Sequence, residues 1–424
     1  MSTAETSTGA QASLSEVTRV FGRIGLLSFG GPAAQIALMH KELVDDRPWL
    51  SEKQFLSALS FCMLLPGPEA MQLATYAGWM KRGVLGGLIA GGLFVLPGAA
   101  VILALALAYI SYGDLPLVQA GFVGIQAAVV GVVFFALRKI AAKALKGLEG
   151  IALAGVSFLA IFVLQLPFPL VVLCAALWGA LRPGPTAASV TTTQVPRFLW
   201  RPVLICLALW LSPIAVLFAF NQEFLLTLAL FFSKLAIVTF GGAYAVLAYM
   251  TQTVVQDHGW LNLPQMIDAL GLAETTPGPL ILITQFVGTL AGHSQGGIAL
   301  AIVASALTLW VTFIPCFLWI FAGAPYVAML TQLPRLSSAL TAITAAVTGV
   351  IANLSIWFAL QVLFGEVQQS AWAPVPVWSS FSPLVAGFMI LALGMMGPLK
   401  RGMMTTLLTL AALALALGAL GVLA

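Results

Sequence analysis

Long apolar runs dominate the chain, and polar positions are confined to short stretches between them. Most runs are about 20 residues long, which is enough for a helix to cross a hydrocarbon core of roughly 30 Å. They do not alternate apolar and polar positions as the strands of a membrane β-barrel do. The pattern therefore predicts an all-α polytopic membrane protein. The 13 predicted segments are 17–39, 55–79, 84–111, 117–137, 149–165, 167–181, 202–220, 225–250, 266–290, 297–323, 338–363, 382–397 and 403–423.

Two short sequences recur at one fixed offset. SFGGP at residues 28–32 returns as TFGGA at 239–243, and LPGPE at 65–69 returns as TPGPL at 276–280. Both pairs are 211 residues apart (239 − 28 = 211; 276 − 65 = 211). The alignment between them needs no gap and also keeps Trp and Asp positions in register, which chance similarity of two apolar stretches does not explain. The chain is therefore predicted to contain a long internal repeat.

The repeat divides the chain. Residues 1–15 are rich in Ser, Thr and Ala and lack the basic and apolar regions of a cleaved signal, so we expect a disordered tail. The long polar connection from Arg182 to Arg201 contains three prolines and is the predicted boundary. The division is thus a first repeat at 16–181, a linker with one connecting membrane helix at 182–221, and a second repeat at 222–424.

The composition indicates a membrane protein, and the distribution of charge indicates how its two repeats are oriented in the membrane. Hydrophobic residues make up 61% of the chain and charged residues 8%, against about 25% charged residues in soluble domains. Loops 40–54, 80–83 and 138–148 carry Lys or Arg, and their repeat partners at 251–265, 291–296 and 364–380 carry none. The bias is reversed in the other two pairs, 112–117 against Arg335 and 165–168 against Lys400 and Arg401. Because cytoplasmic loops carry the excess of Lys and Arg, the two repeats are predicted to be inverted, as in many secondary transporters.

The same count suggests helical hairpins. Loops 40–54 and 80–83 are both basic, although only segment 55–79 lies between them. A segment that enters the membrane, turns at Pro66-Gly67-Pro68 and returns removes the conflict. Re-entrant hairpins at all four Gly/Pro breaks place every basic loop, and the N-terminus, on the cytoplasmic side. The alternative is a bundle of 13 spans with kinked helices.

The Gly/Pro breaks are candidate anion sites. Irregular backbone is tolerated in a membrane only where it is buried in protein or lines a water-filled cavity. Glycine permits the turn and proline suits the first helical position, so a helix starting at each break aims its free N–H groups and positive dipole end at the break. Such an end binds anions, whereas the alternative is glycines for close packing and prolines for kinks. The candidate backbone residues are Gly30, Gly31, Pro66, Gly67, Pro68, Gly241, Gly242, Pro277, Gly278 and Pro279.

Side chains near the breaks extend this hypothesis. Arg23 and its repeat equivalent Lys234 lie in apolar surroundings, where a cation indicates function; snorkelling to the interface is the alternative. Hydroxyl and amide groups precede or follow the breaks by up to two turns. The candidates of this kind are Ser28, Gln72, Thr239 and Gln285.

Two acids are candidate proton carriers. Glu69 follows Pro68, and Glu274 precedes Pro277. A low-dielectric, anion-attracting site disfavours their charged form, so each could take up a proton during a transport cycle. For Glu69, stabilisation by the helix dipole is an equal alternative. The four cysteines and three histidines show no metal-ligand spacing, and we predict no metal, no cofactor and no nucleic-acid partner.

The runs FGRIGLLSFGGPAAQIALMHKELV (21–44) and WLSEKQFLSALSFCMLLPGPEAMQLATYAGWMKRGVLGGLIAGGLFVLPG (49–98) carry a family resemblance. The chain resembles the chromate ion transporter family in its long two-repeat form, from about residue 15 to 423. The resemblance implies an inner-membrane carrier that exports chromate from the bacterial cytoplasm, confers resistance and is driven by the proton motive force, with sulfate as a competing anion. The motif residues that it carries over are Arg23, Gly30, Gly31, Pro32, Pro66, Gly67, Pro68, Glu69 and Gln72.

The second repeat departs from the family pattern, with FGGA for FGGP and PGPL for PGPE. Twofold equivalence of the site is therefore open. Other readings are a passive anion channel of the same architecture and an importer of sulfate or another oxyanion, and a homodimer is left open. An intramembrane enzyme is disfavoured, because the sequence has no metal-ligand cluster, no membrane His/Asp pair and no nucleotide-binding P-loop.

Overall fold

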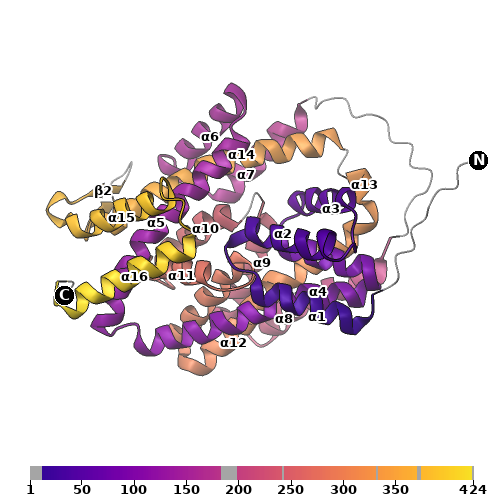
Figure 1. Cartoon of the computed structure of the whole chain (residues 1–424), viewed down its shortest axis with the longest axis horizontal. Helices are drawn as coiled ribbons and strands as arrows, with labels where there is room; N and C mark the ends of the chain where they lie inside the picture. The colour runs from indigo at the N-terminus through magenta and orange to yellow at the C-terminus, as the bar shows by residue number, and fades with distance from the viewer. Residues whose placement is uncertain (1–11, 183–197, 241–242, 331–332, 370–373, 423–424) are drawn as a thin grey trace, which may run out of the picture.

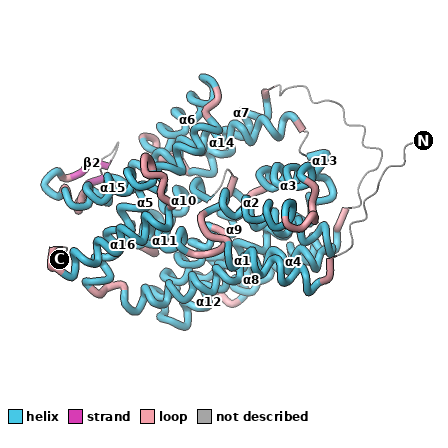
Figure 2. The backbone as a smooth tube through the Cα atoms, viewed as in Figure 1, coloured by secondary structure: helices cyan, strands magenta, loops and turns pink. Residues whose placement is uncertain are grey.

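The computed structural model describes residues 12–182, 198–240, 243–330, 333–369 and 374–422, and these are almost entirely helical (Figures 1 and 2). In the first half and the connection, the helices are α1 (Leu14–Leu27), α2 (Gly31–His40), the π-helix η1 (Lys41–Asp45), α3 (Glu52–Leu64), α4 (Glu69–Tyr112), α5 (Pro116–Ala144), α6 (Gly147–Phe162), α7 (Phe168–Leu181) and α8 (Trp200–Ala219).

The second half repeats this order. Its helices are α9 (Glu223–Val238), α10 (Ala243–Thr251), the π-helix η2 (Gln252–Asp257), α11 (Leu263–Thr275), η3 (Leu280–Leu282), α12 (Ile283–Gly323), η4 (Ala324–Tyr326), α13 (Val327–Leu330), α14 (Pro334–Leu363), η5 (Trp378–Ser380), α15 (Pro383–Met396) and α16 (Met403–Ala419). The strands β1 (Val367–Gln369) and β2 (Pro374–Pro376) pair in antiparallel fashion in a segment predicted as a plain loop.

The segment 55–79 folds back on itself, as the hairpin hypothesis predicts. The rings of Phe61 in α3 and Tyr76 in α4 lie 6.5 Å apart, whereas a continuous helix would separate these residues by roughly 22 Å. Segment 266–290 does the same, because Tyr109 contacts both Asp268 in α11 and Phe286 in α12. The Pro-Gly-Pro breaks are therefore the tips of two helical hairpins.

The Phe-Gly-Gly segments also turn back. Arg23 in α1 lies 3.5 Å from Glu42 in η1, and the ammonium of Lys234 in α9 lies 5.6 Å from the ring of Tyr249 in α10. In each pair one residue precedes the break and the other follows it by about two turns or more. Each half thus has two V-shaped hairpins with a break at the tip.

The two halves are inverted relative to one another. Both α4 and α12 contain a sharp turn, at Gly83 and Gly297, and continue as long helices after it. A Cβ on Gly87 would meet Phe321, and one on Gly91 would meet Phe317. Residue numbers therefore increase along α4 where they decrease along α12, which means that these equivalent helices run antiparallel. In a repeat of parallel topology they would run in the same direction.

The ends of the two halves interleave. α5 packs against α15 and α16 of the second half, and α14 packs against α6 and α7 of the first. Figure 1 shows α5 beside α15 and α16, and α14 beside α6 and α7. Within the described residues, five helices are long and apolar enough to cross a membrane. One of them is α8, which has few buried residues and forms the predicted connecting helix.

A close approach between the halves gives a first prediction. A Cβ on Gly98 of α4 would lie 2.1 Å from the carbonyl oxygen of Pro277. Gly98→Ala must push the second Pro-Gly-Pro tip away, at a cost of about 1–3 kcal/mol. We expect a lower melting temperature in detergent. Gly92→Ala in the same helix has nothing within 4 Å of the new Cβ and should leave it unchanged or slightly raised; equal melting temperatures for the two variants would contradict the packing.

Candidate functional site

Both Pro-Gly-Pro tips meet, at one junction, the residues that lead into the Phe-Gly-Gly breaks, Ser28 and Thr239. The backbone N–H of Gly67 donates to the carbonyl oxygen of Thr239, and that of Gly278 donates to the carbonyl oxygen of Ser28, both at 2.9 Å. Each Pro-Gly-Pro tip is thus bonded to the Phe-Gly-Gly tip of the other half. This reciprocal pair is what a twofold axis between the halves requires.

A small cavity lies at this junction. Its volume is about 10 Å³, at the lower limit for one water molecule. A tetrahedral oxyanion therefore fits only after the tips have moved apart. The cavity is lined by Pro32, Gln35, Pro68, Glu69, Ala70, Thr239, Pro279, Leu280 and Ile281.

Three helix starts surround the cavity. α2 begins at Gly31, α4 at Glu69, and η3 with the following α12 at Leu280. None of these starts has a side chain that caps its N–H groups. The dipoles of α2, α4 and α12 therefore bring partial positive charge to one place, as the break hypothesis predicts. Gly241 and Gly242, which should form the fourth start, lie outside the described residues.

Gly67 shows why this tip needs glycine. Its φ is +116°, a conformation that L side chains rarely adopt. A Cβ there would lie 2.9 Å from the sulfur of Cys316 and 3.0 Å from the side-chain nitrogen of Gln72. The tip is both strained for other residues and tightly packed against the opposite half.

Gln35 is a junction residue that sequence reasoning missed. Its side-chain nitrogen donates to the carbonyl oxygens of Gly278, at 2.6 Å, and Ser28, at 3.2 Å. Its side-chain oxygen is buried and has no hydrogen-bond partner among the described residues. A buried polar atom without a partner costs about 1–3 kcal/mol. Comparison of the two repeats could not reveal Gln35, because Val246 occupies the equivalent position in the second repeat.

The other two glutamines support the breaks from nearby. Gln72 donates to the carbonyl oxygen of Pro66 at 2.7 Å. Gln285 donates to the carbonyl oxygen of Ala99 and the hydroxyl of Ser305. Among the described residues, the side-chain oxygens of both are also buried without a partner. These amides brace the tips, and neither lines the small cavity.

The two hydroxyls are engaged elsewhere. Ser28 and Thr239 are buried, and their hydroxyls donate to the carbonyl oxygens of Ile24 and Leu235, one turn earlier in their own helices. In this conformation the backbone carbonyls of Ser28 and Thr239 make the junction contacts instead. The expectation of two hydroxyl donors aimed at a ligand does not describe the closed junction.

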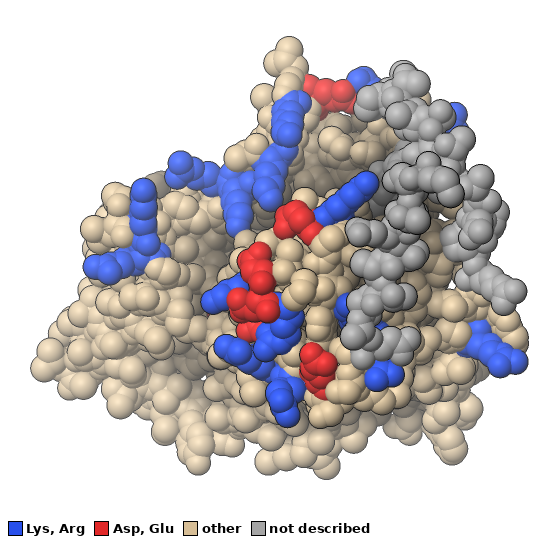
Figure 3. All heavy atoms as spheres, turned by 45° about the vertical axis from the view of Figure 1, so that its right-hand side comes forward, with Lys and Arg blue, Asp and Glu red and all other residues tan. Residues whose placement is uncertain are grey.

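The two cations do not lie at the junction cavity. Arg23 is 60% exposed and pairs with the buried carboxylate of Glu42, which also binds Arg47. Lys234 is exposed and lies over the ring of Tyr249. Both sit more than one helical turn before the breaks, where each contacts the returning arm of its own hairpin. In Figure 3 many of the Lys and Arg side chains gather around one side of the molecule, and the lower left of that view is uncharged.

The two predicted acids have different surroundings. Glu69 lines the junction cavity at the start of α4. Glu274 is 2% exposed and accepts a hydrogen bond from the hydroxyl of Tyr244 in α10. Another buried acid, Asp268 in α11, was missed because the sequence gives no break or cation beside it. No group of three metal-ligating side chains occurs in the part of the chain that the structure describes.

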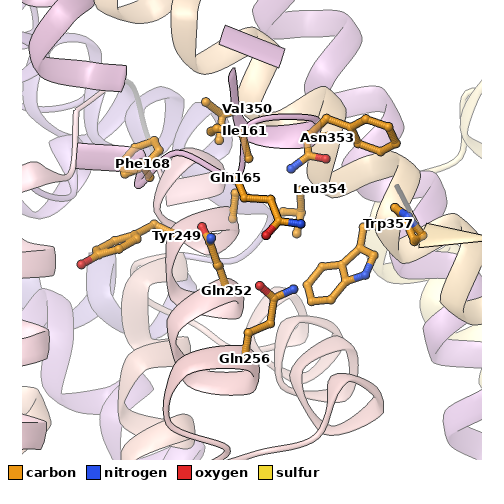
Figure 4. Close-up of a pocket in the computed structure, with 13 residues that line it drawn as sticks. Ile161, Gln165, Phe168, Tyr249, Gln252, Gln256, Val350, Asn353, Leu354 and Trp357 are labelled. Carbon is orange, nitrogen blue, oxygen red and sulfur yellow. The ribbon is translucent and has the colours of Figure 1, made fainter. Parts of the chain in front are cut away.

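A larger cavity lies against α10 and η2, close to Lys234. Its volume is about 360 Å³. Figure 4 shows the amide groups of Gln165, Gln252, Gln256 and Asn353 around it, with Trp357 on one side. Its lining residues are uncharged, and Gln165 and Gln256 belong to regions without Lys or Arg. The cavity therefore combines four amide groups with mostly apolar lining residues.

Two inverted halves whose helices are broken at Gly/Pro sequences define the class of the protein as an all-α polytopic membrane protein. Comparison with known proteins identifies the family. The chromate transporter family matches residues 15–180 and 226–422, so the chain belongs to it. No solved structure matches the chain.

Curated relatives cover most of the chain. It is 32% identical over 361 residues to a probable chromate transport protein of Synechococcus elongatus, covering 83% of this chain and 86% of the relative. It is 30% identical over 348 residues to the chromate transport protein of Cupriavidus metallidurans, covering 81% and 82%. For that of Pseudomonas aeruginosa the identity is 31% over 345 residues, covering 79% of each chain.

His40 gives a prediction on pH. It links the end of α2 to the start of α3 by bonding Glu52 at 2.7 Å, and it lies 3.3 Å from Asp45. The hydrogen bond to Glu52, helped by the charges of Glu52 and Asp45 and opposed by burial, raises the pKa of His40. A raised pKa stabilises the fold most below the ordinary value of about 6.5, and this stabilisation is lost as pH rises through the raised value.

The melting temperature of His40→Gln should therefore fall below that of the wild type at acid pH and converge with it as pH rises. Glu52→Gln should reproduce the acid difference, and added salt should shrink it because the pair is exposed. A His40→Gln deficit that grows with pH would contradict this assignment.

Proposed function

We propose that the chain is a secondary active transporter that exports chromate, with the junction of the four breaks as its substrate site. The observation that carries the proposal is the convergence of three uncapped helix starts on one cavity. N–H groups and dipoles of this kind bind a tetrahedral oxyanion. The names of the relatives supply chromate as the first candidate, and sulfate shares its charge and shape.

The closed junction supports a carrier rather than a channel. A cavity of about 10 Å³ leaves no open path, and the tips hold one another through backbone hydrogen bonds. The repeats at 16–181 and 222–424 are proposed to rock against each other around the junction, so that it opens to one side at a time. The antiparallel packing of α4 and α12 supports this motion.

The charges support export. The basic loops are proposed to face the cytoplasm, where their field raises the local concentration of anions. Arg23, with its partner Glu42, lies on the approach from this side. Lys234 and the amide-lined cavity of about 360 Å³ are proposed to lie on the exit path in the inner bacterial membrane. Glu69 and Glu274 are the proposed proton carriers that link export to the proton motive force.

Uptake of labelled chromate into everted membrane vesicles tests the proposal. We expect energy-dependent uptake that a protonophore abolishes and that excess sulfate reduces. Uptake that ignores the protonophore would indicate a passive channel. The absence of uptake in everted vesicles, together with uptake in vesicles of native orientation, would indicate an importer.

Two glycine variants test the junction itself. Gly67→Ala crowds the sulfur of Cys316 and the amide of Gln72 at the Pro-Gly-Pro tip, so we expect uptake to fall at least about tenfold, equivalent to roughly 1.4 kcal/mol. Gly83→Ala is the matched control, because Gly83 also has positive φ but its Cβ would meet nothing within 4 Å. Equal uptake by the two variants, at equal amounts in the membrane, would exclude the junction as the site.

A variant of Gln35 tests the contact that sequence reasoning missed. Gln35→Val installs the residue of the second repeat and leaves the carbonyl of Gly278 without its side-chain donor. We expect chromate uptake to fall about tenfold, since an unsatisfied buried acceptor costs about 1–3 kcal/mol. Gln54→Val at the start of α3 removes an exposed capping amide and should leave uptake close to that of the wild type. Normal uptake by Gln35→Val would show that this amide has no part in the site.

A further inference from the structure

Asp268 is a buried carboxylate that joins the two halves. It lies in α11 and is 4% exposed. One oxygen accepts a hydrogen bond from the hydroxyl of Tyr109 in α4, and the other accepts from the amide of Gln126 in α5, both at 2.8 Å. Both donors come from the first half and the acid from the second. The carboxylate therefore fastens the second Pro-Gly-Pro hairpin to the long helices of the other repeat.

No cation balances this acid among the described residues. The groups that face it are the hydroxyl of Tyr109 and the amide of Gln126, and beyond Tyr109 lies Asp114 in the α4–α5 loop, which acts on that tyrosine. Arg138 of α5 is 12 residues beyond Gln126, or roughly 18 Å along the helix. Other titratable groups on the elements packed against α11 are Glu69, Tyr76, Lys81, Arg82, Tyr112, Lys139, Lys143, His293, Cys316 and Arg335.

The acid occurs in one half only. The first-repeat equivalents of Asp268 and Glu274 are Ser57 and Met63 (268 − 211 = 57; 274 − 211 = 63). Two acids therefore lie on the helix that runs from the uncharged loop to the junction, and none lies at these positions of its counterpart. Ionisable residues inside a membrane are expensive and indicate function. The presence of both acids only on the helix that starts at the uncharged loop favours a proton that enters from the side of that loop.

We propose that Asp268 takes up the proton that drives transport from the outer solution, by way of the Asp114 end of α4, and shares the role of proton carrier with Glu69 and Glu274. The inference rests on the proposed function and deepens it. A hydronium ion of the outer solution gives its proton to one carboxylate oxygen and leaves as water, and no covalent bond of the protein breaks. That oxygen becomes a donor, so Tyr109 or Gln126 loses its acceptor. The α11–α12 hairpin is then released from α4 and α5, and its tip at Gly278 can leave the junction.

The purified full chain in proteoliposomes separates two activities. When an imposed pH gradient drives the accumulation of labelled chromate, a proton bound to the protein must cross the membrane. Exchange of labelled for unlabelled chromate at equal concentrations on both sides requires no net proton movement. Asp268→Asn keeps the shape and one acceptor oxygen but cannot exchange protons. We expect this variant to retain exchange within about twofold and to lose accumulation at least about tenfold, a change of roughly 1.4 kcal/mol or more.

Tyr109→Phe is the matched control, because it removes one donor and leaves the carboxyl. We expect it to retain accumulation and to shift the pH midpoint of exchange to higher pH, since the charged form loses a hydrogen bond. Accumulation by Asp268→Asn equal to that of the wild type would overturn the proposal. Loss of exchange together with accumulation would also overturn it, because it would show a purely structural or binding role.

If Asp268→Asn does not fold, a measurement on the wild-type protein still tests the proposal. Dicyclohexylcarbodiimide reacts with protonated carboxyls in apolar surroundings, and mass spectrometry locates the adduct. We expect modification at residue 268 that decreases as pH rises and that chromate alters. Absence of modification at every pH would count against Asp268. A wild-type protein that ignores the pH gradient while still exchanging chromate overturns the proton coupling, and the role of Asp268 with it, but leaves the substrate site in place.

Discussion

Backbone N–H and C=O groups inside a membrane must find partners within the protein, and the rest of this structure depends on that constraint. Each hairpin tip breaks its helix and exposes such groups. Gly67 and Gly278 bond to the carbonyl oxygens of Thr239 and Ser28 across the junction. Neither half can satisfy its own tips, so the two halves close around each other. In the proposed transport cycle, a substrate would replace the contacts that hold the junction shut.

The junction is symmetric in its backbone and asymmetric in its side chains. Backbone hydrogen bonds, helix starts and the two π-helices occur in both halves at equivalent places. Gln35, Glu69 and Asp268 occur in one half each. A carrier needs symmetry to present one site to both sides, whereas direction and coupling need a difference between the sides. In the proposed transport cycle, the symmetric backbone would present the site to both sides, and the asymmetric side chains would set direction and coupling.

Buried polar side chains were the least predictable part of the site. Gln35 lies in an apolar helix, and its importance comes from the carbonyl of Gly278, 243 residues away. Asp268 gains its partners from α4 and α5 of the other half. Arg23 is the opposite case. Its position in an apolar run suggested a role at the break, but it pairs with Glu42 on the returning arm of the same hairpin and does not line the junction cavity. Spacing along a helix does not reveal which long-range partner a side chain meets.

The sequence alone determined the membrane class, the 211-residue repeat, the inversion of the halves and the four broken helices. These follow from local properties, since hydropathy, glycine and proline act within a few residues and the positive charges of loops report their side of the membrane. Tertiary structure decided that the tips meet, that three helix starts share one cavity and that α5 and α14 exchange partners between halves. Those facts depend on packing between residues hundreds of positions apart, which no local pattern encodes.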